Sequence, residues 1–332
     1  MSNLHSFSLL LQKFFNEYLI SQRQTSYHTI SSYRDCFSLL LRYAQKKFHK
    51  APSKITLSDL NIDFIIGFLD HLENDRKSSI KSRNQRLAVI RSFFHYISFY
   101  VPEEIEMIKQ VLSIPQKKYE HKIVTFLDQP EIDELVSVID QNTWYGRRDY
   151  ALFMLMIQTG LRVSEVTKIC YKDINLKQGP YVRCTGKGRK ERFTPLTKHM
   201  VKVSKKWIAE NKFKENEYIF PSRNGGHLSS DTVQYSLKKY INIAGKKCSS
   251  LLDKKISPHV LRHTAAVQLL NAGIDIATIA LWLGHESIET TNIYLKADLS
   301  RKEKLLYSFS PMNVKQGRYI PDDKLLEYLR TL

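Results

Sequence analysis

The 332-residue sequence predicts a mainly α protein, with an N-terminal helical bundle followed by an α-rich domain that contains a small antiparallel β-sheet. Three observations support this fold class. Apolar residues recur at three- and four-residue spacing through most of the chain, as in helices that bury one face. Two short strand-like runs, Tyr181–Thr185 and Arg192–Leu196, flank a basic turn with glycines, which is typical of a β-hairpin. The chain is also long enough for two cores of ordinary size.

Four amphipathic helices build the predicted bundle. The first spans about Phe7–Ser21, the second follows Thr25–Ser26, and the third begins near Ser58, a candidate N-cap. The fourth spans about Ser79–Tyr100. Its polar side is either a solvated face or a surface that enters a nucleic-acid groove, with four candidate residues: Lys81, Arg83, Asn84 and Arg86.

The predicted domain boundaries follow from a break in this pattern. Residues 1–113 form the bundle, and residues 114–124 are polar, basic and without periodicity, as in an interdomain linker. Lys117 and Lys118 in this linker are candidate contacts for a DNA backbone, with a solvated tether as the alternative. Residues 125–310 form the second domain, and residues 311–332 form a tail with a short amphipathic helix.

The net charge indicates a polyanionic partner. The chain has 51 Lys and Arg against 33 Asp and Glu, a formal net charge of +18. A surface this positive attracts nucleic acid, although a merely basic protein has the same composition. The four cysteines are too far apart to indicate a zinc site or a disulfide framework, and neither a signal peptide nor a membrane-spanning run is expected. The sequence therefore predicts a cytoplasmic protein without membrane association.

Seven helices are expected in the second domain, at about 129–139, 148–158, from 162, 230–244, 258–272, 275–283 and 288–295. Four short motifs, at or between these helices, carry residues suited to phosphate chemistry. Each motif taken alone is more often an ordinary surface feature. Their order along the chain is what gives them weight.

The first motif is Thr159–Glu165, where a glycine ends one helix and Arg162 enters the next. Glu165, three residues on, is a supporting residue that can orient the Arg162 guanidinium toward a phosphate. The second motif is the hairpin turn. Its Lys187 is a candidate proton donor, and two further basic residues there are candidate DNA contacts: Arg189 and Lys190.

The third motif begins with Ser257 as an expected N-cap and Pro258 in the first helical turn. His259 and Arg262 are three residues apart, so they share the helix face near the positive end, where an anion is favoured. His259 and His263 are four apart and could instead bind zinc. No carboxylate follows the first histidine, however, so the sequence does not favour a metal site here.

The fourth motif is Leu283–Tyr294, with His285 in a turn and Tyr294 on the helix that follows. Together, and in this order, the four motifs resemble those of the tyrosine recombinase (phage integrase) family, and within it the Xer-like and simple integrase group. The resemblance covers about residues 125–296 closely. The first part of the chain resembles the core-binding, SAM-like domain of that family in kind.

The resemblance implies a site-specific DNA recombinase and assigns six catalytic residues: Arg162, Lys187, His259, Arg262, His285 and the nucleophile Tyr294. Cleavage through a 3′-phosphotyrosyl link is reversed by another strand, so the family needs no cofactor or metal. The implied partner is double-stranded DNA with inverted core sites, bound by a dimer per site and a homotetramer on paired sites. The role would be integration or excision of a mobile element, or Xer-like dimer resolution. The tail would dock on a neighbouring subunit in trans, with packing on its own domain as the alternative.

Two other functions share part of this pattern. A type IB topoisomerase-like enzyme would use the same chemistry to relax DNA without exchanging strands. A non-catalytic DNA-binding protein on the same scaffold would have no use for the six residues, and their presence argues against it.

Overall fold

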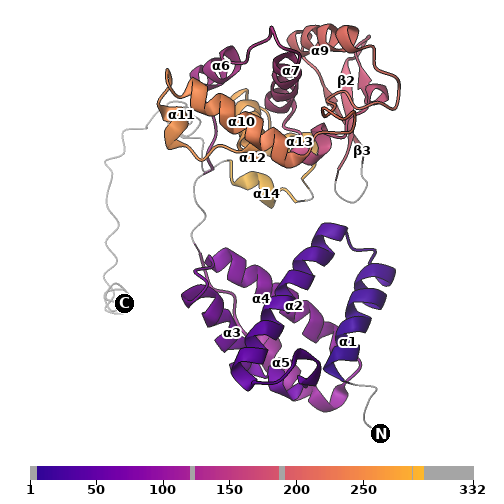
Figure 1. Cartoon of the computed structure of the whole chain (residues 1–332), viewed down its shortest axis with the longest axis vertical. Helices are drawn as coiled ribbons and strands as arrows, with labels where there is room; N and C mark the ends of the chain where they lie inside the picture. Colours follow the sequence, from indigo (N-terminus) through magenta and orange to yellow (C-terminus); the bar gives the residue numbers. More distant parts are fainter. Residues whose placement is uncertain (1–5, 120–123, 187–190, 286, 295–332) are drawn as a thin grey trace, which may run out of the picture. The chain divides into compact units, whose positions relative to one another are not determined.

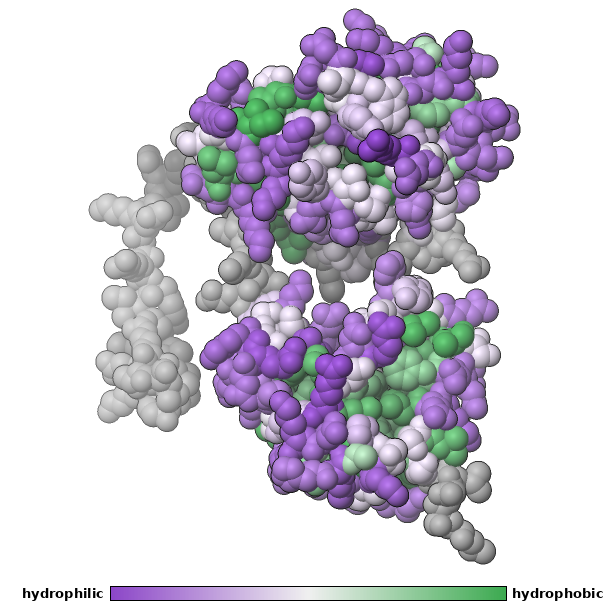
Figure 2. Space-filling view, in the orientation of Figure 1, coloured by the Kyte–Doolittle hydropathy of each residue, from purple (hydrophilic) through white to green (hydrophobic). Residues whose placement is uncertain are grey.

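The computed structural model describes residues 6–119, 124–186, 191–285 and 287–294. The chain divides into two compact units, an N-terminal unit of residues 1–121 and a C-terminal unit of residues 122–332. Both are built mainly from helices, and the C-terminal unit also holds a three-stranded antiparallel sheet, so the predicted fold class is confirmed (Figure 1). Hydrophilic residues cover most of the visible face of each unit (Figure 2).

The N-terminal unit is a bundle of α-helices around an aromatic core. Ser26 and Ser79 accept backbone N–H groups as N-caps of the second and fourth helices, where the sequence predicts their starts. The rings of Phe14, Phe37 and Phe93 meet edge-on at its centre, with centroids 5.3–6.3 Å apart. The helices are α1 Phe7–Lys13, continued by the π-helix η1 Phe14–Gln22, α2 Tyr27–Phe48, α3 Ile62–Asn74, α4 Ile80–Ile97 and α5 Ile105–Ser113.

One prediction for this unit was wrong, and one helix was missed. The N-cap of α3 is Asn61, whose side chain accepts the N–H of Phe64, whereas Ser58 begins the 3₁₀ turn Ser58–Leu60. Helix α5 was not predicted. It has only nine residues, so two buried side chains, Ile108 and Val111, carry its periodicity.

The C-terminal unit is arranged around the helix α7 (Trp144–Thr159), which packs on α9 (Lys198–Asn211) and α12 (Pro258–Asn271) (Figure 1). Among the described residues of both units, no helix is long and apolar enough to cross a membrane. The helices α9 and α11 were not predicted. The helices are α6 Gln129–Ser137, α7 Trp144–Thr159, α8 Val163–Val166, α9 Lys198–Asn211, α10 Ser230–Ala244, α11 Ser250–Asp253, α12 Pro258–Asn271, α13 Ile276–Leu283 and α14 Glu289–Asn292.

The sheet has the order β1-β2-β3, with strands β1 Ile174–Asn175, β2 Tyr181–Thr185 and β3 Glu191–Pro195. Strands β2 and β3 form the predicted hairpin, with Cys184 opposite Arg192. The two-residue strand β1 was too short to predict. The tip of the hairpin, residues 187–190, lies outside the described residues.

Gly160 ends α7 at the point where three helices converge. Its φ of +66° is a left-handed conformation that favours glycine. A Cβ at this position would lie 2.6 Å from Leu283 Cδ2 on α13 and 3.2 Å from Ala265 Cβ on α12. The missing side chain therefore lets the last turn of α7 sit against both of these helices.

We expect Gly160→Ala to destabilise the C-terminal unit by about 2–4 kcal/mol, because strain in the backbone adds to overpacking. Gly179→Ala is the control, since Gly179 has a φ of +65° but nothing within 4 Å of an added Cβ. It should cost only about 1 kcal/mol. Urea unfolding followed by tryptophan fluorescence measures the difference, because all three tryptophans lie in the C-terminal unit. Equal losses would contradict the packing argument.

Candidate active site

Arg162 is held by a carboxylate and a backbone carbonyl. It lies immediately before α8, and its Nη1 donates to Glu165 Oε1 at 2.8 Å. Glu165 Oε2 also accepts the Arg162 backbone N–H at 2.7 Å, so the predicted orienting pair is present. The Arg162 Nη2 donates to Gly284 O at 3.3 Å. About a third of the Arg162 side chain stays exposed, which leaves it accessible to an anion.

Arg262 is held by two backbone carbonyls from different helices. Its Nη1 donates to Gly160 O at 2.8 Å, and its Nη2 donates to Leu283 O at 2.7 Å. The residue is only 1% exposed. Burial, and then the positive charge of Arg162, lower the pKa of Arg262 to about 10, so it remains a cation at neutral pH.

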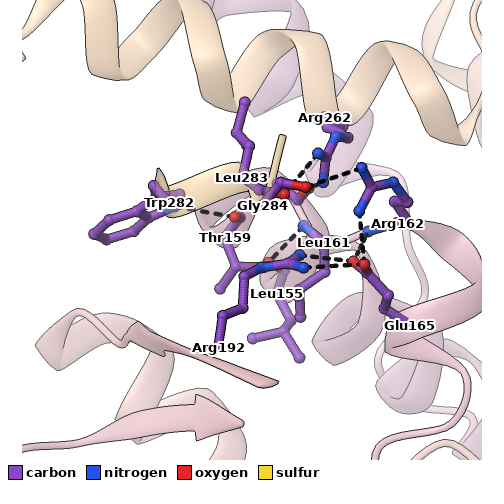
Figure 3. Close-up of polar contacts among 11 residues, drawn as sticks. Leu155, Thr159, Leu161, Arg162, Glu165, Arg192, Arg262, Trp282, Leu283 and Gly284 are labelled. Atoms are coloured by element: carbon purple, nitrogen blue, oxygen red, sulfur yellow. Dashed lines mark hydrogen bonds and ion pairs between the residues drawn. The ribbon is translucent and has the colours of Figure 1, made fainter. Parts of the chain in front are cut away.

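The two guanidinium groups meet at one peptide segment. Arg162 and Arg262 are 100 residues apart in the sequence, yet they donate to the consecutive carbonyls of Gly284 and Leu283. Figure 3 shows both side chains reaching this turn. A third arginine, Arg192 on β3, forms two parallel hydrogen bonds with Glu165, at 3.0 and 2.7 Å.

Tyr294 lies in the same part of the unit, with its ring among apolar side chains of α12 and α13. The residue is 2% exposed. Its hydroxyl oxygen lies 2.9 Å from Nδ1 of His263, within hydrogen-bond distance, and the tautomer decides which atom donates. The His285 ring is stacked at 6.4 Å from the Tyr294 ring, and its Nδ1 lies 2.8 Å from Thr291 Oγ1.

Burial and the arginines set the titration of this cluster. Burial lowers the pKa of His263 to about 4, helped by the neighbouring His259. Burial also lowers the pKa of His285 to about 4, together with the charges of the arginines. The pKa of Tyr294 is raised by burial, while Arg262 and Arg162 oppose this by favouring the phenolate. Both histidines are therefore neutral at pH 7.

The structure brings together five of the six predicted catalytic residues on neighbouring elements. His259 is exposed on the first turn of α12, and its ring contacts that of His263 at 4.7 Å. Ser257, the expected N-cap of this helix, forms no capping hydrogen bond through its side chain, whereas Pro258 is in the first turn as predicted. Lys187, Arg189 and Lys190 lie outside the described residues, as does the tail of residues 311–332.

Two residues of the cluster were missed as functional candidates. In the sequence, Arg192 is the first residue of a strand-like run beside the basic turn, and His263 is half of a zinc alternative. Nothing local in the sequence identifies either one, because their partners Glu165 and Tyr294 are 27 and 31 residues away. Over the described ranges, no group of three His, Cys, Asp or Glu residues could hold a metal ion.

The assignment of Arg83 and Asn84 as DNA contacts needs correction, because both side chains are buried in the N-terminal unit. Arg83 donates to Pro115 O, and Asn84 forms hydrogen bonds with both backbone groups of Lys117, so they hold the segment after α5 against α4. Lys81 and Lys118 are exposed, and Arg86 is half-buried. Lys117 is exposed but forms an ion pair with Glu73.

A buried tyrosine hydroxyl within the electrostatic reach of two fixed guanidinium groups, on an α-rich unit that follows a helical bundle in the chain, is typical of an enzyme that breaks and rejoins DNA strands. Residues 125–301 match the phage integrase family, and residues 12–98 match its N-terminal SAM-like domain. The chain belongs to this family, the tyrosine site-specific recombinases.

Relatives and solved structures agree with this family. The chain is 46% identical, over all of both chains, to the "Putative integrase/recombinase y4rC" of Sinorhizobium fredii. It is 31% identical to tyrosine recombinase XerD of Listeria monocytogenes, over 90% of this chain and 97% of that one. The fold is similar to that of XerH recombinase bound to difH substrate, with a TM-score of 0.66, 23% identity and coverage of 86% and 80%. A topoisomerase-like or non-catalytic function is not favoured by these matches.

We expect the stability of the C-terminal unit to fall as the pH is lowered from about 6.5 to 4. In this window His263 and His285 are protonated in the unfolded chain but stay neutral in the folded protein. The unfolded state therefore binds more protons, and acid favours it. Urea unfolding between pH 7.5 and 5, followed by tryptophan fluorescence, measures the slope. His263→Gln should flatten it, and the exposed His199→Gln should not. An unchanged slope in His263→Gln would contradict the lowered pKa.

We expect Asn84→Ala to destabilise the N-terminal unit by about 1–2 kcal/mol, because two hydrogen bonds to Lys117 are lost. Lys81→Ala removes an exposed charge, so it should change stability by less than about 0.5 kcal/mol but weaken binding to DNA. Hydrogen exchange of peptides from α4 and α5 measures the first effect, and a binding titration at two salt concentrations measures the second. If Asn84→Ala keeps the wild-type stability, the structural role of the Asn84 hydrogen bonds to Lys117 is contradicted.

Proposed function

We propose that the Tyr294 hydroxyl oxygen attacks a phosphorus atom of one DNA strand. A bond forms between this oxygen and phosphorus, and the bond from phosphorus to the 5′ oxygen breaks. The product is a 3′-phosphotyrosyl link and a free 5′ hydroxyl. Because the link conserves the energy of the broken ester, a 5′ hydroxyl of a partner strand can reverse the step and complete the exchange.

The proposal depends on one observation, the meeting of Arg162 and Arg262 at the consecutive carbonyls of Gly284 and Leu283. Backbone anchors fix both guanidinium groups before any substrate arrives, and each group has further N–H donors for the two non-bridging oxygens of a phosphate. Such preorganised cations stabilise the charge that develops in the transition state. They also favour the ionised form of Tyr294, as the direction of their effect on its pKa supports.

Histidines and a lysine handle the protons in this scheme. The 2.9 Å contact with Tyr294 makes His263 the nearest imidazole to the phenolic proton, and His259 lies one helical turn before it. We assign proton removal to this histidine pair, and a hydrogen bond to the phosphate to His285. Lys187 keeps its assignment as the proton donor to the departing 5′ oxygen, on the family resemblance alone.

The proposed substrate is double-stranded DNA with inverted core sites, in the cytoplasm. A dimer binds each site, and a homotetramer forms when two sites pair. The net charge of +18 supports extensive phosphate contact. Full-length similarity to an integrase/recombinase, and similarity to Xer proteins, support a role in integration and excision or in dimer resolution.

The experiment is a trap for the covalent intermediate. Tyr294→Phe protein first selects its binding site from a random-sequence duplex pool, and that site is rebuilt with a nick near the cleavage position. Wild-type protein should then accumulate a covalent protein–DNA adduct, because the short cleaved fragment diffuses away. Tyr294→Phe should lower adduct formation by at least about 1,000-fold, since the nucleophile is lost.

The control for this trap is Tyr235→Phe, which changes an exposed tyrosine on α10 and should form the adduct at the wild-type rate. An adduct with the Tyr294→Phe protein would move the nucleophile to another residue.

A further inference from the structure

Arg192 occupies an unusual position for a cation. Its side chain is only 12% exposed, and the residue is the second of β3, opposite Cys184 on β2. Its Nη1 and Nη2 donate to the two oxygens of Glu165 at 3.0 and 2.7 Å, while its buried Nε has no hydrogen-bond partner among the residues that the structure describes. Burying such a pair costs free energy of desolvation, and an apolar pair of similar volume would often stabilise a core as well. A role in orientation accounts better for this arrangement.

Glu165 links Arg192 to Arg162 through hydrogen bonds. Its carboxylate accepts four hydrogen bonds, two from Arg192 and two from Arg162. The two parallel bonds from Arg192 fix the plane of the carboxylate, so that Oε1 points at Arg162 Nη1. Burial would raise the pKa of Glu165, but the bonds and charges of the two arginines lower it, so the carboxylate stays ionised.

Arg192 also supports the second anchor of Arg162, the Gly284 carbonyl. Gly284 has a φ of +66°, and a Cβ at this position would lie 2.8 Å from Arg192 Nη1 and 3.3 Å from its Cζ. The turn that precedes His285 therefore rests directly on the Arg192 guanidinium. Figure 3 shows Arg192, Glu165, Arg162 and Gly284 as one connected group.

We propose that Arg192 is a positioning residue that fixes both the Glu165 carboxylate and the Gly284 turn, and thereby directs Arg162 at the scissile phosphate. The inference rests on the proposed function, in which Arg162 binds that phosphate. Arg192 itself touches no reacting atom in this scheme. Its effect should appear in the cleavage step rather than in DNA binding.

The test compares variants of two arginines on adjacent strands. Arg192→Gln removes the cation, and Arg192→Lys keeps the charge but cannot form two parallel hydrogen bonds to one carboxylate. Arg183→Gln is the matched control, because Arg183 on β2 pairs with Asp173 in the same sheet region. Melting temperature, affinity for the nicked duplex described above and the rate of adduct formation are measured for each.

Both Arg192 variants should bind the duplex within about threefold of wild type but form the adduct about 10- to 100-fold more slowly, because misplacement of a positioned group costs rate. Arg183→Gln should keep the wild-type rate within about threefold. If Arg192→Gln does not fold, Arg192→Lys decides the test. A wild-type rate for a folded Arg192→Lys protein would overturn the proposal, and so would an equal loss of rate in Arg183→Gln.

A double variant distinguishes positioning from a general structural role. If Arg192 acts through Arg162, then Arg162→Lys with Arg192→Gln should form the adduct no more than about threefold more slowly than Arg162→Lys alone. Multiplied losses would overturn the proposal, because they would show independent effects. If Arg162→Lys and Arg162→Gln both cleave at the wild-type rate, the proposed role of Arg162 fails instead. The two failures are therefore distinguishable.

Discussion

The ion pairs of Glu165 hold the positively charged part of this site together. Two guanidinium groups share its buried carboxylate, and a third, that of Arg262, lies close enough for the charge of Arg162 to lower its pKa. Like charges that lie close together in a poorly solvated environment repel one another strongly. The ionised carboxylate of Glu165, in the first turn of α8, lowers this repulsion. The remaining positive charge is then available to an anionic substrate.

The same burial that strengthens these ion pairs keeps the histidines neutral. Burial lowers the pKa of His263 and of His285 to about 4, so the imidazoles around Tyr294 are neutral at pH 7 and add nothing to the positive charge of the arginines. One environment thus holds charged guanidinium groups and neutral imidazoles side by side. Arginine and histidine differ enough in intrinsic pKa for this to work at pH 7.

Most of the helices, the hairpin and the family could be predicted, because apolar periodicity and short motifs are local properties. The missed elements were short or polar: α5, α11 and β1 have nine, four and two residues, and α9 has only three buried side chains. Pairings across the chain could not be predicted. The polar face of α4 looked like a DNA surface, since nothing in the sequence reveals that Arg83 and Asn84 meet the backbone of residues 115 and 117. The roles of Arg192 and His263 could not be predicted for the same reason, because their partners are distant in the sequence.

Two of the oxygens that restrain Arg162 and Arg262, one for each arginine, belong to the main chain of Gly284 and Leu283. No side-chain substitution can delete a carbonyl, so these two groups are immune to most point mutations, unlike the Glu165 carboxylate. They are vulnerable only to changes in the path of the chain, such as a side chain at Gly284. A survey of polar residues would pass over both positions, although they determine where two of the positive charges stand.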